Sequence, residues 1–259
     1  TDEGPSEIRH LSTALDHMLQ RQRALLEAQE QSEARLRRFI ADASHELQTP
    51  LTSVLGWVQL ERKGALDEAG TAAAMERIEA EGRRMSVLVE ELLLLARLDE
   101  QRPLHLAPTD LAAVALDAVT DARAVEPDRT ITLDAPSPVI VAGDAFRLRQ
   151  VIDNLLRNVR VHTPAGAPAT VRVFVDGDHA MVVVEDAGAG IDPESLDHVF
   201  DRFWRRDHSR TRATGGAGLG LAIVTALVAA HGGTVAASNL ATGGAAFTVA
   251  LPLSADQRA

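Results

Sequence analysis

The residues most able to do chemistry lie between Phe39 and Gly56, where polar side chains surround a histidine. His45 and Thr49 are four residues apart, so on a helix they are neighbours on one face. Glu46 is rotated away and reaches the imidazole only if its side chain bends back. The apolar residues fall on another side of the same helix: Ala41, Ala43, Leu47, Leu51, Val54 and Leu55. The spacing therefore predicts a histidine presented to solvent.

Pro50 lies one turn beyond Glu46. Because proline has no amide hydrogen to offer the carbonyl of Glu46, we expect the helix to kink or loosen directly below the histidine. Such a kink gives a partner room to approach. A lone exposed histidine is nevertheless a routine surface residue, and the case for chemistry depends on the residues around it.

Two asparagines stand out in another predicted helix, Phe146 to Arg160. Asn154 and Asn158 are four residues apart on one side, whereas the apolar positions form the face that we expect to be buried: Val151, Ile152, Leu155, Leu156 and Val159. Asparagine is a poor residue for a helix interior, so two of them stacked favour a ligand. An amide oxygen suits Mg²⁺, which keeps several waters and takes its other ligands from phosphate. Taken alone, the pair is also typical of surface asparagines.

An aspartate follows a predicted strand, Ala180 to Glu185. Asp186 is followed by Gly188 and Gly190. A carboxylate at a strand end can accept a hydrogen bond from the amino group of adenine, and glycines let the backbone turn close to a ring. An acidic hairpin turn is the other interpretation of the same residues.

A glycine-rich stretch precedes the predicted helix Leu219 to Ala230: Gly215, Gly216, Gly218 and Gly220. Its backbone amides and the start of the helix make a cradle for an anion such as a polyphosphate. The stretch has neither the GK[ST] ending of a P-loop nor the GxGxxG spacing of a dinucleotide fold. Between Asp186 and this stretch, residues 199–214 are polar and rich in arginine, which favours a lid over the phosphates or a solvated basic loop.

The string SHELQTPLT closely resembles the phosphoacceptor box of the sensor histidine kinases, whose usual form is SHELRTPLT. The resemblance implies that His45 is phosphorylated, that Glu46 assists the proton transfer, and that Thr49 orients water in the reverse, phosphatase reaction. Gln48 stands where the family usually has arginine. That departure leaves the acceptor chemistry intact and bears on how the nucleotide or the partner is held.

The three downstream segments, in this order, are similar to the ATP-binding domain of the same kinases, which belongs to the GHKL superfamily. The resemblance implies that Asn158 binds Mg²⁺ beside Asn154, and that Asp186 binds adenine within the Gly188 and Gly190 turn. It also implies that a set of residues holds the triphosphate: Gly216, Gly218, Leu219 and Gly220. The family commonly has Lys-Tyr where this chain has Val161-His162. The basic residues expected to replace the missing lysine are His162, Arg202, Arg205 and Arg210.

The elements that must position these residues begin with a heptad seam: Ile8, Leu11, Leu15, Met18, Gln22, Leu25, Gln29, Ser32, Leu36, Phe39 and Ala43. The first part also looks like the second helix of the HAMP signal-relay module. We expect this helix to continue to about Arg62 and a second helix to run from about Glu68 to Leu98. Their apolar stripes are too wide for one hairpin to cover, which predicts a homodimer with a four-helix bundle.

Residues 100–103 break the helical pattern and predict a linker. Beyond it, strands adjacent in sequence with helices between the pairs predict an α+β layer sandwich rather than a doubly wound parallel sheet. We therefore expect three parts: a HAMP-like helix and coiled-coil connector over 1–30, a dimerisation and histidine-phosphotransfer hairpin over 31–102, and an ATP-binding domain over 103–259.

Composition limits the classes of function. The 259 residues are 46% hydrophobic and 24% charged, enough to bury a core, and the net charge of -11 argues against a nucleic-acid partner. The chain has no cysteine, which excludes disulfides and thiolate zinc sites. No apolar run approaches the ~18 residues of a membrane span. The chain starts at Thr1, and we expect the cytoplasmic portion of a membrane receptor kinase.

The residues and the resemblance together predict a protein histidine kinase. It would use ATP and Mg²⁺ to phosphorylate His45, pass the phosphoryl group to an aspartate of a response-regulator receiver domain, and act as a phosphatase. Two alternatives stay open: a GHKL ATPase that is not a kinase, and a nucleotide-binding scaffold or phosphatase-only relative.

Overall fold

The computed structural model describes residues 4–99, 104–204 and 217–254. The chain divides into two compact units, Thr1–Glu81 and Gly82–Ala259. Helix α2 has residues in both units, and each unit is described by itself below.

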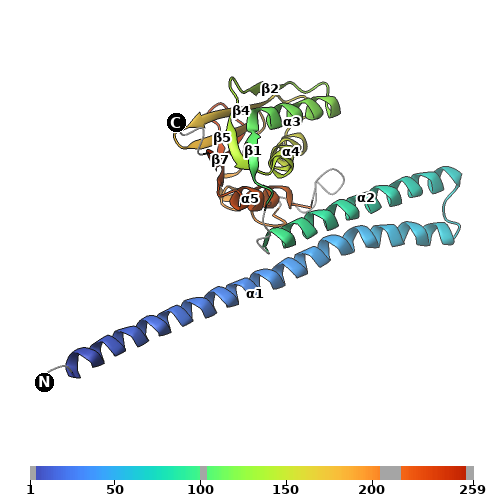
Figure 1. Cartoon of the computed structure of the whole chain (residues 1–259). Helices are drawn as coiled ribbons and strands as arrows, with labels where there is room; N and C mark the ends of the chain where they lie inside the picture. Colours follow the sequence, from blue (N-terminus) through green and yellow to red (C-terminus); the bar gives the residue numbers. More distant parts are fainter. Residues whose placement is uncertain (1–3, 100–103, 205–216, 255–259) are drawn as a thin grey trace. The chain divides into compact units, whose positions relative to one another are not determined.

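The first unit is a helical hairpin (Figure 1). Helix α1 (Gly4–Arg62) continues without interruption through Pro50, so the proline does not end it. After a turn at Gly64, Asp67 accepts a hydrogen bond from the backbone N–H of Gly70 (2.8 Å) just as α2 (Glu68–Asp99) begins. The predicted ends of both helices, about Arg62, Glu68 and Leu98, are confirmed to within one residue.

Side chains from both helices meet beside this turn. Thr71 in α2 donates a hydrogen bond to Glu61 in α1 (2.7 Å), and the guanidinium of Arg77 lies 4.9 Å from the ring centroid of Trp57. Ala74 is buried between them, only 1% exposed. These contacts confirm two antiparallel helices packed as a hairpin.

A large part of the apolar surface of α1 is open in the single chain. Exposed apolar residues include Met18, Leu26, Ile40, Leu51 and Leu55, with exposed fractions of 65%, 54%, 55%, 47% and 52%. Of the predicted heptad seam, Gln22 and Gln29 are exposed as well. The side chains at Ile8, Leu11, Leu15, Leu25, Ser32 and Leu36 lie outside the described residues, so the seam stays a prediction there.

The second unit contains a sandwich of one helical layer and one sheet. The five-stranded sheet has the order β2-β4-β5-β7-β6, with strands β2 (Ile131–Asp134), β4 (Ala169–Asp176), β5 (His179–Asp186), β6 (Thr234–Asn239) and β7 (Ala245–Pro252). All neighbours are antiparallel except β2 and β4. The predicted α+β layer sandwich is confirmed.

Three helices supply the other half of the core: α3 (Leu111–Val125), α4 (Ala145–His162) and α5 (Gly220–Ala230). Asp110 caps α3 and Asp144 caps α4, each through a side-chain oxygen that accepts from a backbone N–H of the first turn. The alternating residues of β4 and β5 meet the apolar faces of these helices; Leu155, Val171, Val184 and Ile223 are completely buried.

The sequence interpretation missed a small second sheet. Strand β1 (Ala107–Asp110) pairs antiparallel with β3 (Ile140–Gly143). Residues 107–110 are Ala-Pro-Thr-Asp, with Thr109 as their only strand-forming residue, so only pairing with β3 makes them a strand. A short 3-10 turn, η1 (Pro193–Ser195), was also missed. Within the described ranges, no helix is both long and apolar enough to cross a membrane.

Candidate active site

His45 lies on the exposed surface of α1, as predicted. Thr49, one turn further on, is also exposed, and its hydroxyl donates to the carbonyl oxygen of His45 (3.1 Å). That bond leaves the lone pairs of the threonine oxygen free to accept from water. Glu46 is half-buried. The helix thus presents an accessible imidazole with a hydroxyl beside it and a carboxylate at the next position.

Asn154 and Asn158 lie one turn apart on α4, and Asn154 lies close to the start of α5. The Nδ2 of Asn154 donates to the carbonyl oxygen of Gln150 (3.0 Å), and its Oδ1 lies 3.4 Å from the place of a Cβ at Gly220. Asn158 is half-buried, and its side chain forms no hydrogen bond to any described residue. Its amide oxygen is therefore available for a hard cation that takes its remaining ligands from water and phosphate, which fits Mg²⁺.

Asp186 is the last residue of β5 and is only 7% exposed. One carboxylate oxygen, Oδ1, accepts from the backbone N–H of Gly188 (2.8 Å) and of Ala245 (3.3 Å). The other oxygen, Oδ2, accepts no hydrogen bond from the described part of the chain. A buried carboxylate held in this way can accept a hydrogen bond from an N–H donor such as the amino group of adenine.

The described end of the glycine-rich stretch lies close to residues that are distant in sequence. Phe203 donates its backbone N–H to the carbonyl oxygen of Gly218 (3.0 Å), and a Cβ at Gly218 would lie 2.9 Å from the carbonyl oxygen of Trp204. Gly218 also has φ +75°, so glycine is required there on both counts. Gly220 begins α5, whose first backbone N–H groups suit an anion.

The remaining predicted residues have mixed outcomes. Leu219 is completely buried, so only its backbone can reach a ligand. His162 is the last residue of α4, one turn beyond Asn158, and Arg202 is half-buried; both interact with other residues of the protein. Arg205, Arg210 and Gly216 lie outside the described residues, so their predicted roles stay predictions.

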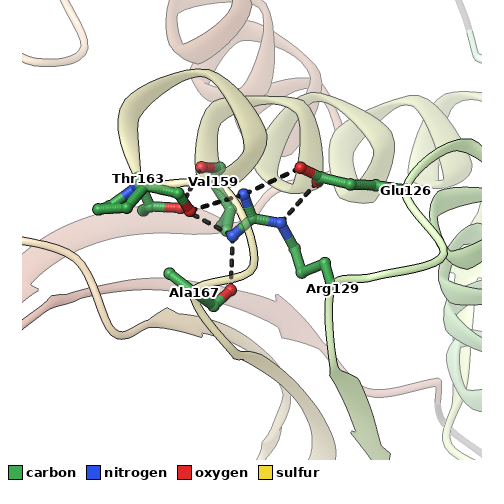
Figure 2. A network of polar contacts seen from close by, with 6 residues as sticks. Glu126, Arg129, Val159, Thr163 and Ala167 are labelled. Carbon is green, nitrogen blue, oxygen red and sulfur yellow. Dashed lines mark hydrogen bonds and ion pairs between the residues drawn. The ribbon is translucent and has the colours of Figure 1, made fainter.

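A buried arginine supports the segment behind the aspartate (Figure 2). Arg129 is 3% exposed and donates to the Thr163 hydroxyl (2.8 Å) and to the carbonyl oxygens of Pro164 (3.1 Å) and Ala167 (2.5 Å). Thr163 in turn packs against the aspartate turn, because a Cβ at Gly188 would lie 2.9 Å from its Cγ2. Arg129 therefore holds the segment that supports the Gly188 turn.

The same arginine is paired with a carboxylate. Glu126 Oε2 lies 2.6 Å from Arg129 Nε. The hydrogen bond from Arg129 lowers the pKa of Glu126, burial opposes that effect, and the charges of Arg129 and Arg160 add to it. The buried guanidinium is thus neutralised beside the segment that it holds.

Residue chemistry alone did not identify Arg129, Ala245 or Asn239 as part of this site. The side-chain amide of Asn239 binds the backbone of Ile191 in the turn that follows Asp186. Ala245 contributes its backbone N–H, a group that nearly every residue has, so the residue type gives no sign of this role. Asn239 is an asparagine at a strand end before a Thr-Gly-Gly turn, a weak signal that is compatible with any hairpin. Arg129 follows Glu-Pro-Asp in a turn and looks like an ordinary surface residue.

Comparison with known proteins identifies both parts. Residues 35–101 match the family model "His Kinase A (phospho-acceptor) domain", and residues 143–255 match "Histidine kinase-, DNA gyrase B-, and HSP90-like ATPase". The probable sensor histidine kinase TcrY of Mycobacterium tuberculosis is 46% identical over 254 residues, 97% of this chain and 53% of that protein.

Two solved structures extend the comparison. The mycobacterial sensor histidine kinase MprB is 31% identical, with a TM-score of 0.51, and the match covers 57% of this chain and 97% of that one. Full-length ShkA in complex with AMPPNP is 29% identical, with a TM-score of 0.60, and the match covers 83% of this chain and 45% of that one.

A phosphoacceptor hairpin followed by a GHKL-type ATP-binding sandwich defines a class of signalling kinases. The chain belongs to the sensor histidine kinases of two-component systems. It spans about half the length of the curated relatives that it matches.

Proposed function

We propose that this chain is the catalytic half of a sensor histidine kinase that phosphorylates His45 from ATP and then passes the phosphoryl group to an aspartate of a response-regulator receiver domain. The observation that carries the proposal is the exposed imidazole of His45, in a chain that also has a buried, half-satisfied carboxylate at Asp186. The nucleotide complex of the similar kinase ShkA supports ATP as the donor.

The sandwich would bind the nucleotide at both the base and the phosphates. At the base, Asp186 Oδ2 would accept from the amino group of adenine, a donor that guanine lacks at the same place. At the phosphates, the start of α5 around Gly218 and Gly220 offers backbone N–H groups. Asn158 would hold Mg²⁺ beside Asn154, and the ion supplies charge neutralisation for the polyphosphate. His162, Arg202, Arg205 and Arg210 would replace the lysine that the family commonly uses.

The chemical step would be an in-line displacement. A ring nitrogen of His45 donates its electron pair to the γ-phosphorus, and the bond from that phosphorus to the β–γ bridging oxygen breaks, which releases ADP. Glu46 orients the ring and takes up its remaining proton. Because the protein does little covalent work here, the rate depends mainly on positioning the nucleotide and the imidazole.

The second step would use the same helix. The phosphorylated imidazole meets a receiver domain docked on α1 near Trp57, and the phosphoryl group moves to the receiver aspartate. In the reverse direction, the hydroxyl of Thr49 would align water for hydrolysis of the phosphorylated receiver. Both steps need His45 and Thr49 on an accessible helix face, which supports the assignment.

The proposed arrangement is a homodimer through the hairpin, with the domains bounded at about 30 and 102. The exposed leucines of α1, such as Leu51 and Leu55, support a second copy as the partner that covers them. In the whole protein we infer a membrane-anchored receptor, of which this chain is the cytoplasmic portion. The greater length of the curated relatives supports that inference.

The test is autophosphorylation with [γ-³²P]ATP and Mg²⁺. The wild-type chain should acquire an acid-labile label, and His45→Gln should acquire none while its affinity for ATP is unchanged. A label retained by His45→Gln would refute the assignment of the acceptor. ATP binding without any label in the wild type would favour the scaffold or phosphatase-only alternative, which Gln48 and Val161 support. Steady ATP hydrolysis by His45→Gln would favour a GHKL ATPase that is not a kinase.

A further inference from the structure

Asn239, the last residue of β6, binds the backbone of a residue 48 positions earlier in the chain. Its Oδ1 accepts from the N–H of Ile191 (2.7 Å), and its Nδ2 donates to the carbonyl oxygen of Ile191 (2.6 Å). The side-chain amide thus pairs with one residue of the turn that follows Asp186, much as a strand neighbour would. Two short hydrogen bonds to one residue constrain both its position and its orientation.

The turn is built to fit against this side chain. Gly190 has φ +76°, and a Cβ there would lie only 2.8 Å from Oδ1 of Asn239. No other residue type fits without a shift of the turn or of Asn239. The turn between Asp186 and Ile191 therefore rests directly on the amide of Asn239.

Asn239 is connected to both donors that hold the aspartate. In the β6–β7 register, Asn239 is opposite Ala245, whose N–H binds Asp186 Oδ1. Through Ile191, Asn239 holds the turn that carries Gly188, whose N–H binds the same oxygen. The direction of the free oxygen, Oδ2, depends on those two N–H groups, since they fix the carboxylate plane.

We propose that Asn239 is a positioning residue that aims the Oδ2 of Asp186 at the nucleotide base. This inference rests on the proposed function, because it takes Asp186 as the group that recognises adenine. Asn239 acts on the base end of the site and has no role at the phosphates or at Mg²⁺.

The chemistry of the side chain explains why asparagine is needed. A primary amide both donates and accepts from one planar group, which matches a backbone N–H and C=O pair. Aspartate keeps the acceptor for the Ile191 N–H but places a second anionic oxygen against the Ile191 carbonyl. Alanine removes both bonds and leaves space beside Gly190.

The experiment measures dissociation constants of ATP and GTP with Mg²⁺ for the wild type, Asn239→Ala, Asn239→Asp and a matched control. Ser238→Ala is that control, because Ser238 is the exposed neighbour in β6 and has no polar partner among the described side chains. We expect Asn239→Ala and Asn239→Asp to reduce the preference for ATP over GTP by about tenfold, and Ser238→Ala to leave it unchanged. The ratio of the two affinities is independent of the fraction of protein that is folded.

A second readout separates the base end from the phosphate end. Asn239→Ala should weaken ATP, ADP and AMP by the same factor, and should raise KM for ATP in autophosphorylation while kcat is unchanged. If Asn239→Ala left the ratio of the ATP and GTP affinities unchanged, the role of Asn239 would be refuted. It would also be refuted if the substitution weakened the binding of ATP but not that of ADP and AMP. Failure of the wild type to bind ATP would instead refute the proposed function.

Discussion

At the scale of single residues, the site depends on polar groups that the protein leaves without a full set of partners. Asp186 has two hydrogen bonds on one carboxylate oxygen, and Asn158 has none to the described residues. A buried polar group without a partner costs free energy, so such groups persist where a ligand completes them. His45 differs because it is exposed and costs nothing to leave free.

Replacing Asp186 by asparagine should weaken ATP binding by about 10- to 150-fold, the range that corresponds to the ~1.5–3 kcal/mol of a hydrogen bond to a charged group. The change removes the charge and places an N–H₂ group either toward the backbone donors or toward the adenine amino group. Isothermal titration calorimetry measures the affinity. An ATP affinity equal to that of the wild type would remove Asp186 from the base site.

Replacing Thr49 by alanine should abolish phosphatase activity toward a phosphorylated receiver and leave labelling of His45 intact. The hydroxyl donates to the carbonyl oxygen of His45 on the exposed surface of the helix. Its loss should therefore change the free energy of unfolding by no more than ~0.5 kcal/mol. The measurement is release of phosphate from the receiver, with Thr52→Ala as control, since Thr52 makes the same bond to Gln48. Equal phosphatase rates in both variants would argue against a role for Thr49.

At the scale of elements, the proposed nucleotide site consists of segments whose backbone is held by contacts on the side away from the site. The segment after α4 supports the Gly188 turn through Thr163, and Arg129 in the α3–β2 connection fixes that segment. The start of α5 is fixed in a comparable way by the pairing of Phe203 with Gly218. These supports order the backbone donors before any ligand arrives, which lowers the entropy cost of binding.

Replacing Arg129 by methionine should lower the free energy of unfolding of the sandwich by about 3–5 kcal/mol, which is the cost of removing one partner of a buried ion pair. Several carbonyl oxygens and Glu126 lose their donor together. Arg123→Met is the control, because Arg123 is exposed and, among the described residues, donates only to the Ile131 carbonyl. Urea denaturation measures both, and a loss no larger than that of Arg123→Met would contradict this role.

Glu126 should make stability depend on pH at the acidic end. Its pKa is lowered below the usual 4.5, so its contribution is complete above about pH 4.5 and is lost as the pH falls through the lower folded value. The difference in unfolding free energy between the wild type and Glu126→Gln should therefore shrink as the pH drops below 4.5. Denaturation at several pH values tests this prediction. If the difference in unfolding free energy grew as the pH fell, the prediction for Glu126 would be wrong.

At the scale of the whole molecule, the hairpin leaves much of its apolar surface open. A monomeric protein rarely exposes a large contiguous apolar patch, and the exposed apolar residues of α1 include Ile40, Leu51 and Leu55. The match of residues 35–101 to a phosphoacceptor domain agrees with a bundle that needs two copies. The sandwich, in contrast, completes its own core around residues such as Leu155 and Val184.

The double substitution Leu51→Glu and Leu55→Glu should weaken the dimer at least tenfold. Each leucine is about half exposed in the single chain, and its full burial is worth about 1.5–3 kcal/mol, which a charged residue forfeits. The matched control is Leu106→Glu with Leu116→Glu, two leucines of the sandwich that are 57% and 52% exposed. Analytical ultracentrifugation measures the association. An equally tight dimer in the hairpin variant would place the interface elsewhere.

Most of the elements, and the accessibility of the histidine, were predictable because they depend on neighbours in the chain. The periodicity of the apolar residues predicted both long helices and the exposed face of His45. The predicted strand Ala180 to Glu185 followed from its run of apolar residues, and it lies within β5. Helix α1 continues through Pro50 to Arg62, in agreement with the predicted end of the helix.

What the sequence determined by itself is the set of elements and the types of residue that could bind a nucleotide or accept a phosphoryl group. Only the tertiary structure decided that the N–H of Ala245 binds Asp186, that Asn239 binds the turn after Asp186, and that Arg129 holds the segment against which the Gly188 turn packs. It also decided that β1 is a strand. The physical reason is that each of these contacts joins residues far apart in the chain. Their partners are mostly backbone groups, which every residue carries and no pattern of side chains records.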